Sequence, residues 1–579
     1  MEKVVKPQAS KGAEEILLTQ IKQEFTTPAD AISEYLELVE KNIEESGIEI
    51  EDEIEQIKSG CVRLIDQYEE AFVLNTGPNA TQEKKTAEEY SELRHNLRTP
   101  LNAIIGYSEI LIEDMEDDLN EQSLSDLQTI IDLSREIEKA IESSSKAFIT
   151  WSKTTPINRA RILSKYKDLL IKNMEELAVM VSEQHGKTIA DAKGSIQRGI
   201  EDVEYATGIT DSLKGDHSTS VGTNVDSHTL RQPLGVCAGI TPFNFPAMVP
   251  MWMYPVSIAC GNTFVLKPSE KDPSCPMRLA EIAIEAGLPA GVLNVVNGDK
   301  EAVDTLLENK TVQAISFVGS TPIAEYVYHT GTKNNKRVQA LGGAKNHMVI
   351  MPDADVNKTT DAIIGSAFGS AGERCMAISV AVCVGKQTKE KIKTKLLEET
   401  AKLNVGPYTD EKSDFGPLNN KAHFEKVLGY IDTGEKEGAK LLSDGRNFKK
   451  QGYENGYFVG PTIFDDVKPE MKIYKEEIFG PVLSMMTTET YEEALNLVND
   501  HELGNGAAVF TKSGNIAKHF TENAKIGMIG VNVPIPVPVA YHSFGGWKRS
   551  LFGDHSMHGP EGVRFYTKLK TATVTWVED

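Results

Sequence analysis

The stretch NTFVLKPSEKDPSCPMRLAEIAIEAGLPAGVLNVVNG (residues 262–298) predicts a strand, a helix and a second strand in succession. The two outer runs are short and β-rich, whereas apolar residues recur at helical spacing between them and a glycine ends the pattern. Similar β-rich runs lie on either side, VCAGI at 236–240 and AISFVGS at 314–320. Because strands that alternate with helices form parallel sheets covered on both faces, we expect an α/β protein.

The same alternation returns from Met348 to about Val531, which predicts two α/β lobes with a ligand site in the cleft between them. No GxGxxG follows any predicted strand, so the usual dinucleotide fingerprint is missing from the sequence. FVGST at 317–321 offers another strand-to-helix junction, with Pro322 suited to the first helical position and free amides able to hold a phosphate. A simple helix cap is the alternative interpretation.

Residues 1–136 differ from the rest of the chain in charge and in pattern. They carry 32 acidic and 12 basic side chains, which is most of the net charge of −24, and their apolar residues follow a helical period. TTPADAISEYLEL at 26–38 matches RTPLNAIIGYSEI at 98–110, which predicts two helical hairpins able to form a four-helix bundle. We expect an all-α extension, with hairpins over 1–75 and 80–136.

Composition narrows the class of protein. At 579 residues, 40% of them hydrophobic and 25% charged, the chain suits a soluble protein of several domains. No apolar run is long enough to span a membrane, and the N-terminus has neither an export signal nor a transit peptide, so we expect a cytoplasmic protein. The six cysteines show no CxxC pair or metal-ligand spacing, and the acidic front end disfavours nucleic acid and membrane partners.

Six motifs occur in order: ITPFNFPAMVP (240–250), LKPSE (266–270), FVGST (317–321), GERCMA (372–377), EEIFGPV (476–482) and FGGWK (544–548). Together they resemble the aldehyde dehydrogenase superfamily, from about Ile137 to the C-terminus. The resemblance implies four further features: an NAD-binding domain over 137–343, oligomerisation strands near 213–233, a catalytic domain over 344–535 and a C-terminal oligomerisation segment over 536–579. It also implies a homo-oligomer, either a dimer or a tetramer.

The resemblance assigns the chemistry to a thiolate. Cys375 of GERCMA matches the family's nucleophile, which attacks the aldehyde, passes hydride to NAD and is left as a thioester. The adjacent Arg374 and the loop amides are expected to favour the thiolate. Asn244 of PFNFP matches the side-chain donor to the oxyanion. Inert core filling and a turn are the purely structural alternatives for a cysteine and an asparagine.

The same motifs imply an NAD site. Lys267 and Glu270 are implied to hold the adenosine ribose, where a carboxylate repels the 2′-phosphate of NADP. Glu477 is implied to hold the nicotinamide ribose. The other implied cofactor contacts are Thr241, Phe243, Lys271, Ser320 and Gly342. No metal site is expected.

One departure from the family's sequence pattern indicates whether water or a thiol receives the acyl group. Hydrolytic members carry a glutamate where this chain has Leu341, in QALGGAKNH at 339–347, and leucine cannot activate water as a base. A thiol with a pKa near 8.5 ionises more easily, so coenzyme A is the expected acceptor. QALGGAKNH, GERCMA and the segment VNVPIPVPVAYHSFGGWKRSLFGD at 531–554 resemble the coenzyme A-acylating, methylmalonate-semialdehyde branch.

In that branch two arginines hold the substrate carboxylate, and Arg198 and Arg374 match them. The implied reaction converts methylmalonate semialdehyde to propanoyl-CoA, and malonate semialdehyde to acetyl-CoA, with loss of CO2 or bicarbonate. A hydrolytic dehydrogenase that releases a free acid is the first alternative. The second is a signalling or scaffold protein whose dehydrogenase-like domain is only a sensor; it is disfavoured because the motif residues are intact.

LRHNLRTPLNAIIGYSEIL at 93–111 resembles the dimerisation and phosphoacceptor helix of sensor histidine kinases, with His95 at the phosphoacceptor position. Asn96 stands where that family usually has an acid, the first repeat has Gln23 at the matching place, and no ATP-binding domain follows. We therefore expect a scaffold or docking module that could bind a protein partner. We also expect that the chain does not phosphorylate its own His95. This repeat occupies the place of the dehydrogenase family's customary first strands.

Overall fold

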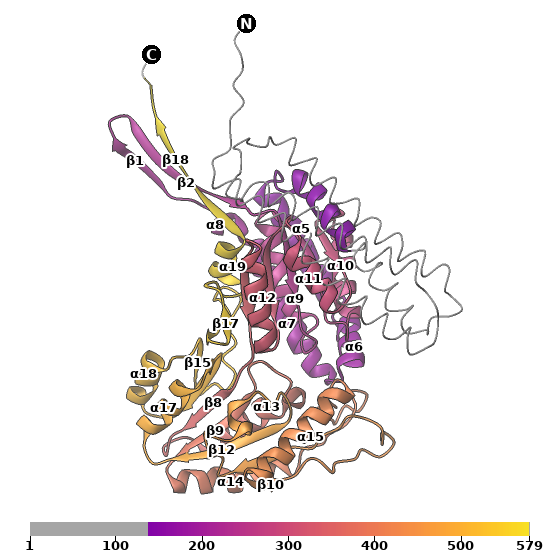
Figure 1. The fold of residues 1–579 in the computed structure, drawn as a ribbon, viewed down its shortest axis with the longest axis vertical. Coiled ribbons are helices and arrows are strands. Elements are labelled where there is room, and N and C mark those ends of the chain that lie inside the picture. The colour runs from indigo at the N-terminus through magenta and orange to yellow at the C-terminus, as the bar shows by residue number, and fades with distance from the viewer. Residues whose placement is uncertain (1–136, 578–579) are drawn as a thin grey trace, which may run out of the picture. The chain divides into compact units, whose positions relative to one another are not determined.

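The computed structural model describes residues 137–577, so both predicted hairpins and His95 lie outside the described residues. Two large sheets define two lobes, which we call the first and second lobe in chain order (Figure 1). The predicted α/β class with parallel sheets is confirmed. In chain order, the last parallel strand of the first sheet ends at Leu341, and the first strand of the second sheet begins at Asn346.

The sheet of the first lobe has the strand order β17-β7-β6-β3-β4-β5, parallel throughout except for the antiparallel edge pair β17–β7. Its strands are β3 (Val236–Ile240), β4 (Thr263–Lys267), β5 (Leu293–Val295), β6 (Val312–Val318), β7 (Arg337–Leu341) and β17 (Leu551–Phe552). Its helices are α5 (Pro156–Lys172), α6 (Met174–His185), α7 (Ile189–Thr207), α8 (Ile209–Ser212), α9 (Met248–Ala259), α10 (Ser274–Glu285), α11 (Lys300–Glu308) and α12 (Thr321–Lys333). A helix over 137–151 precedes them.

The sheet of the second lobe has the order β10-β11-β12-β9-β8-β14-β15, with only β10 antiparallel to its neighbour. Its strands are β8 (Asn346–Ile350), β9 (Ile378–Val384), β10 (Lys440–Ser443), β11 (Thr462–Asp465), β12 (Val482–Thr488), β14 (Gly506–Phe510) and β15 (Met528–Val531). Its helical elements are α13 (Val356–Ala367), the 3-10 turn η1 (Gly369–Gly372), α14 (Lys386–Thr400), α15 (Lys421–Lys436), α16 (Lys472–Lys475), α17 (Tyr491–Asp500) and α18 (Gly514–Asn523).

A third, antiparallel sheet extends beyond the first lobe as an arm (Figure 1). It consists of β1 (His217–Gly222), β2 (Val225–Pro233) and β18 (Thr567–Thr575), in the order β1-β2-β18. The short strands β13 (Leu503–Gly504) and β16 (Trp547–Lys548) pair with each other, and α19 (Gly559–Phe565) precedes β18. The arm thus joins the predicted segment 213–233 to the C-terminal segment.

Burial explains why the central strands carry unbroken apolar runs. Every residue of β3, β4, β8 and β14 is buried, because helices cover both faces of a parallel sheet. The polar Asn262 is tolerated just before β4 because its side chain accepts from the amides of Leu234 and Gly235 and donates to the carbonyls of Ser257 and Tyr566. Its bond to Tyr566 also ties the start of β18 to the first lobe.

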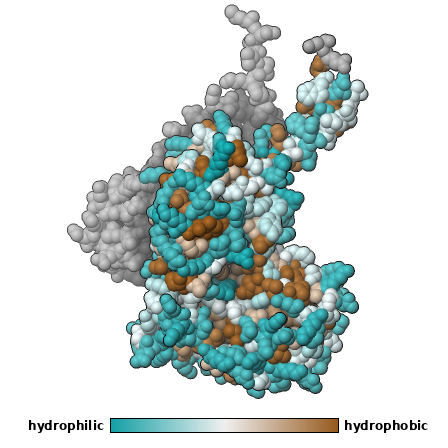
Figure 2. Space-filling model, turned by 180° about the vertical axis from the view of Figure 1, so that it is seen from behind, coloured by the Kyte–Doolittle hydropathy of each residue, from teal (hydrophilic) through white to brown (hydrophobic). Residues whose placement is uncertain are grey.

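The surface seen in Figure 2 is mostly hydrophilic, with apolar side chains in scattered groups. Among the described residues no helix is both long and apolar enough to cross a membrane. At the predicted phosphate-holding junction, α12 begins at Thr321, so Pro322 is the second helical residue and not the first.

Candidate active site

Parallel strand order gathers the predicted cofactor residues at one edge of the first sheet. Thr241, Lys267, Ser320 and Gly342 lie at or just after the carboxyl ends of β3, β4, β6 and β7. These four strands are neighbours in the sheet, so residues separated by a hundred positions in sequence lie along one edge. Ligands of open α/β sheets bind at this edge.

The end of β4 places a buried ammonium beside an open carboxylate. Lys267 Nζ lies 3.3 Å from Glu270 Oε2, and the Lys267 side chain is 5% exposed whereas that of Glu270 is 51% exposed. Lys271 follows and places its Nζ 4.7 Å from the ring centre of Phe243. A half-exposed carboxylate held by a buried cation can accept hydrogen bonds from ligand hydroxyls.

Helix α12 starts at the same edge. Its N-cap residue Ser320 makes no side-chain cap bond, so the first amides of this 13-residue helix are left for another acceptor. Thr321 Oγ1 instead accepts from the amide of Gly343, 2.9 Å away, and thereby joins the helix to the loop after β7. This geometry suits a phosphate, as the sequence predicts.

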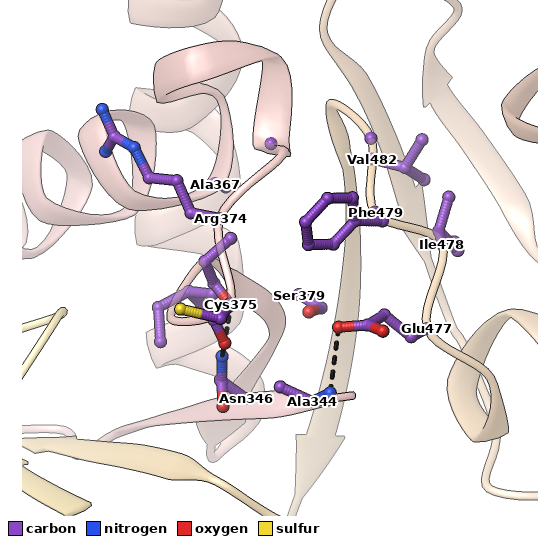
Figure 3. A pocket seen from close by; sticks show the side chains of 14 residues that line it. Ala344, Asn346, Ala367, Arg374, Cys375, Ser379, Glu477, Ile478, Phe479 and Val482 are labelled. Carbon is purple, nitrogen blue, oxygen red and sulfur yellow. Dashed lines mark hydrogen bonds between the residues drawn. The ribbon is translucent and has the colours of Figure 1, made fainter. Parts of the chain in front are cut away.

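The nucleophile candidate lies in the loop between η1 and β9. The Cys375 carbonyl oxygen accepts from Asn346 Nδ2 at 2.9 Å (Figure 3). It also accepts from Asn505 Nδ2 at 3.0 Å. Ser370 and Ala371, upstream in the same connection, have φ values of 54° and 53°, a left-handed conformation that non-glycine residues rarely adopt. Two asparagine side chains and a strained turn therefore hold the cysteine backbone.

Glu477 faces the cysteine loop across a small cavity. The cavity encloses about 10 Å³, enough for one water molecule, and both residues line it (Figure 3). Glu477 Oε1 accepts from the Ala344 amide at 2.9 Å. A Cβ atom on Gly343 would lie 2.5 Å from Glu477 Oε2, so this carboxylate requires a glycine in QALGGAKNH. The two motifs are in contact, although 133 positions separate the bonded residues.

Asn244 is buried and held by two groups. Its side-chain Nδ2 donates to the backbone carbonyl oxygen of Glu373 at 3.1 Å, and its backbone carbonyl oxygen accepts from Lys187 Nζ at 2.6 Å. The amide of Asn244 thus points at the residue two positions before Cys375, which is compatible with a donor to an oxyanion on the cysteine adduct. Lys187 was missed by the sequence reasoning; its only signal is a lysine between Gly186 and Thr188.

Arg374 and the backbone amides favour the Cys375 thiolate, as expected, but desolvation outweighs them. Burial raises the pKa of Cys375 to about 12, and the charge of Glu477 raises it further. Desolvation disfavours the charged form of any acid, and the sequence motif does not reveal how deeply the thiol is buried.

The two predicted carboxylate-binding arginines already have protein partners. Arg374 Nη2 lies 2.6 Å from Asp191 Oδ1 at the start of α7, and the side chain extends away from Glu477 (Figure 3). Arg198 lies about two turns further along α7, half-exposed, with Nη1 2.8 Å from Glu201. Asp191, the partner of Arg374, therefore lies on the same helix as Arg198. No sequence signal singled it out.

Leu341 ends β7 with a side chain that is 2% exposed. It belongs to the same apolar cluster as Met376, and Cys375 packs against that cluster. Because the position is packed with hydrocarbon, it supplies no group that could activate water. Among the described residues, no group of His, Cys, Asp and Glu side chains is arranged to hold a metal ion.

The fold and this site define an aldehyde dehydrogenase. The aldehyde dehydrogenase family model matches residues 125–572, and the chain belongs to that family. A second model, the His Kinase A phosphoacceptor domain, matches residues 87–144.

Characterised relatives point to one branch of the family. The malonate-semialdehyde dehydrogenase of Pseudomonas aeruginosa is 58% identical over 440 residues, covering 76% of this chain and 88% of the relative. That of Bacillus cereus is 51% identical over 441 residues, covering 76% and 90%. A crystal structure described as methylmalonate-semialdehyde dehydrogenase from Sinorhizobium meliloti 1021 complexed with NAD shares 55% identity and a TM-score of 0.76, covering 77% and 91%. The methylmalonate-semialdehyde dehydrogenase of Oceanimonas doudoroffii shares 54% identity and a TM-score of 0.76, with the same coverage.

Desolvation of the partly buried Cys375 makes its reactivity depend strongly on pH. With a raised pKa, the thiolate fraction is small at pH 7 and grows as the pH rises toward that pKa, so alkylation by iodoacetamide should still be accelerating at pH 10. An unperturbed thiol would level off about one unit above a pKa of about 8.5. The rate is measured by mass spectrometry of the Cys375 peptide, with Cys375→Ser as the blank. A plateau by pH 9 would contradict the buried-thiol assignment.

Proposed function

We propose that the chain is an NAD-dependent, coenzyme A-acylating dehydrogenase of methylmalonate semialdehyde and malonate semialdehyde. The observation that carries the proposal is the burial of Leu341 in the apolar cluster against which Cys375 packs. A thioester formed at Cys375 has no carboxylate at that position to activate water. It therefore persists until a more easily ionised thiol, that of coenzyme A, takes the acyl group.

Each of the proposed site residues has a separate role in the reaction. Cys375 adds to the aldehyde carbon, and Asn244 stabilises the resulting oxyanion by hydrogen bonding. NAD, when bound, accepts the hydride. Arg198 and Arg374 hold the substrate carboxylate until it leaves as CO2 or bicarbonate, which gives propanoyl-CoA or acetyl-CoA. Transfer of the acyl group to the coenzyme A thiol restores free Cys375.

The first-sheet edge suits NAD in particular. Lys267 and Glu270 are placed to bind two vicinal ribose hydroxyls, and the exposed Glu270 carboxylate would repel a 2′-phosphate. The free amides at the start of α12 suit the pyrophosphate. Glu477 is assigned to the nicotinamide ribose. Thr241, Phe243, Lys271, Ser320 and Gly342 complete the proposed cofactor contacts.

The decisive experiment follows NADH formation from malonate semialdehyde with and without coenzyme A. We expect turnover that needs coenzyme A and yields acetyl-CoA, detected by mass spectrometry. Cys375→Ala should reduce turnover to background while NAD still binds, because hydride leaves only from the covalent adduct. Substantial steady-state NADH formation without coenzyme A, with malonate as product, would favour the hydrolytic alternative.

Leu341→Glu should shift the product toward free acid and lower the dependence of turnover on coenzyme A, because it places a carboxylate near the thioester. Leu341→Gln is the matched control, since it adds polarity at similar volume but no base. The ratio of acid to acyl-CoA is measured by chromatography. Equal ratios in both variants would show that hydrolysis is limited by something other than this side chain, such as water access.

Arg198→Ala and Arg374→Ala should each raise KM for semialdehydes that bear a carboxylate. A lost charge-assisted contact costs about 1.5–3 kcal/mol, or roughly a tenfold to hundredfold effect. Propanal, which lacks the carboxylate, should be affected much less, and the exposed Arg161→Ala serves as a surface control. Equal losses for charged and neutral aldehydes would mean that these arginines position the loop, through Asp191 in the case of Arg374.

We also propose a homo-oligomer, a dimer or tetramer, assembled through the arm. Leu230 and Leu569 are exposed, and they lie on opposite faces of the arm because Leu569 pairs with Arg231 and Lys570 with Leu230. Apolar side chains on both faces of an uncovered sheet suit a partner subunit. Leu230→Asp combined with Leu569→Asp should lower the oligomeric mass measured by light scattering. An unchanged mass would remove the arm from the interface.

The match of residues 87–144 to the phosphoacceptor model supports a separate role for the front end. We propose that residues 1–136 mediate association with the same chain or with another protein, and that His95 is not phosphorylated by this chain. The light-scattering comparison therefore includes a chain that starts at residue 137.

A further inference from the structure

A cluster of buried titratable side chains lies directly behind the cysteine loop and has no role in the reaction described above. Glu373, two positions before Cys375, is fully buried between His185 at the end of α6 and His423 in the first turn of α15. The cluster therefore joins a helix of the first lobe, the nucleophile loop and a helix of the second lobe.

The two oxygens of Glu373 have different surroundings. Oε1 accepts from the Asn419 amide at 3.3 Å and lies 3.5 Å from His423 Nε2. Oε2 lies 3.6 Å from His185 Nε2, and neither Oε2 nor either ring nitrogen of His185 has a hydrogen-bond partner among the described residues. Buried polar atoms normally have partners, so this pair of unpartnered atoms requires an explanation.

The proton positions follow from the neighbouring acceptors. His423 Nε2 lies 2.7 Å from the Phe479 carbonyl oxygen, which can only accept, so this nitrogen carries a proton in the neutral ring. It therefore also presents its N–H side to Glu373 Oε1. Oε1 is thus an acceptor atom. A proton on Oε2 faces the unpartnered His185 Nε2 and leaves the carboxyl group and both imidazoles neutral.

The charge balance favours the same arrangement. Among the described residues, His185 and His423 are the only side chains within 4.0 Å of the Glu373 carboxyl group that could carry a positive charge. An ionised Glu373 would be a buried negative charge with no lysine or arginine of the described residues within 4.0 Å to balance it, and burial of an ion costs several kcal/mol of desolvation. Burial raises the pKa of Glu373 to about 8, lowers the pKa of His423 to about 4 and holds the pKa of His185 well below its usual range. All three groups are therefore neutral at pH 7.

Glu373 is also the residue through which the two catalytic groups are connected. Its carbonyl oxygen accepts from Asn244 Nδ2 at 3.1 Å, and the next residue, Arg374, pairs with Asp191. A shift of the Glu373 side chain would move its backbone, and with it both the oxyanion donor and Cys375.

We propose that Glu373 is a positioning residue that acts as a neutral carboxylic acid, with its proton on Oε2 facing His185 Nε2 at 3.6 Å and with Oε1 as an acceptor, and that this arrangement holds Cys375 and Asn244 in register for attack. Ionisation of Glu373 places a buried negative charge behind the thiol, which opposes both the thiolate and the oxyanion. The consequence for the reaction rests on the proposed function, whereas the consequence for thiol reactivity does not.

Several other charged side chains lie near Glu373. Lys187 follows α6, Lys271 and Asp272 follow β4, and Arg374 is its neighbour in the loop. The positive charges of Lys187 and Lys271 lower its pKa, whereas the charge of Asp272 raises it. Burial brings the pKa values of Lys187 and Asp272 themselves to about 8. A pH profile of the unmodified protein therefore cannot assign the titration, and a variant that removes only the Glu373 proton is required.

The test compares Glu373→Leu with Glu373→Gln. Leucine retains bulk but no hydrogen bond, so we expect kcat to fall at least tenfold with KM for NAD unchanged. Glutamine reproduces a neutral acid, with a donor on one atom and an acceptor on the other, and should restore most of that loss, to within about fivefold of the unmodified enzyme at pH 7. Glu425→Gln, on the exposed face of α15, is the matched control.

A second readout needs no substrate. The rate of Cys375 alkylation by iodoacetamide is followed from pH 6 to pH 10 in the unmodified chain and in Glu373→Gln. Removing the ionisable carboxyl group should raise the rate above pH 8 by at least about threefold and leave the rate at pH 6 to 7 nearly unchanged. This readout stays valid if the assigned substrate is wrong or if Glu373→Leu does not fold.

Two results would overturn the proposal. A loss of activity in Glu373→Gln as large as that in Glu373→Leu would mean that the carboxylate is ionised and paired with a protonated histidine. An alkylation profile identical to that of the unmodified chain would mean that Glu373 does not titrate in this range.

Discussion

The hydrogen bond from Asn244 Nδ2 to the Glu373 carbonyl oxygen joins the two lobes at the point where the chemistry occurs. Asn244 belongs to the loop after a strand of the first sheet, and Glu373 to the loop that precedes a strand of the second. Neither lobe contains a complete site by itself. Arg374–Asp191 and His185–Glu373 cross the same boundary, so the position of the nucleophile depends on how the lobes are docked.

The exclusion of water at this boundary disfavours charged groups, and several properties of the site follow from this one cause. It raises the pKa of Cys375 and Glu373 and lowers that of Lys187 and His185, because burial disfavours every charged form. It also protects a thioester, since Leu341 fills with hydrocarbon the position from which a base would act. A site that is slow to ionise its own thiol and slow to hydrolyse its intermediate is suited to an acyl acceptor that brings its own thiol.

The cofactor edge depends on a different and more general constraint. Parallel strands place all their carboxyl ends on one side, so Thr241, Lys267, Ser320 and Gly342 are gathered by topology and not by any local sequence signal. We propose that a helix start and a lysine–glutamate pair take the place of the glycine-rich fingerprint of other dinucleotide sites. The arm is built from segments 225–233 and 567–575, and it exposes apolar side chains on both faces.

The sequence by itself determined the class of fold and the two alternating regions, and it singled out the candidate nucleophile. Unbroken apolar strands and helical spacing are local properties, and rare residue types in fixed motifs carry the chemistry. Tertiary structure alone decided what those residues touch. It placed Asp191 against Arg374, Glu477 against the glycine at 343, and Glu373 between two histidines. It also decided that desolvation outweighs Arg374 and the backbone amides at Cys375, because desolvation depends on how many atoms surround a group, and those atoms come from distant parts of the chain.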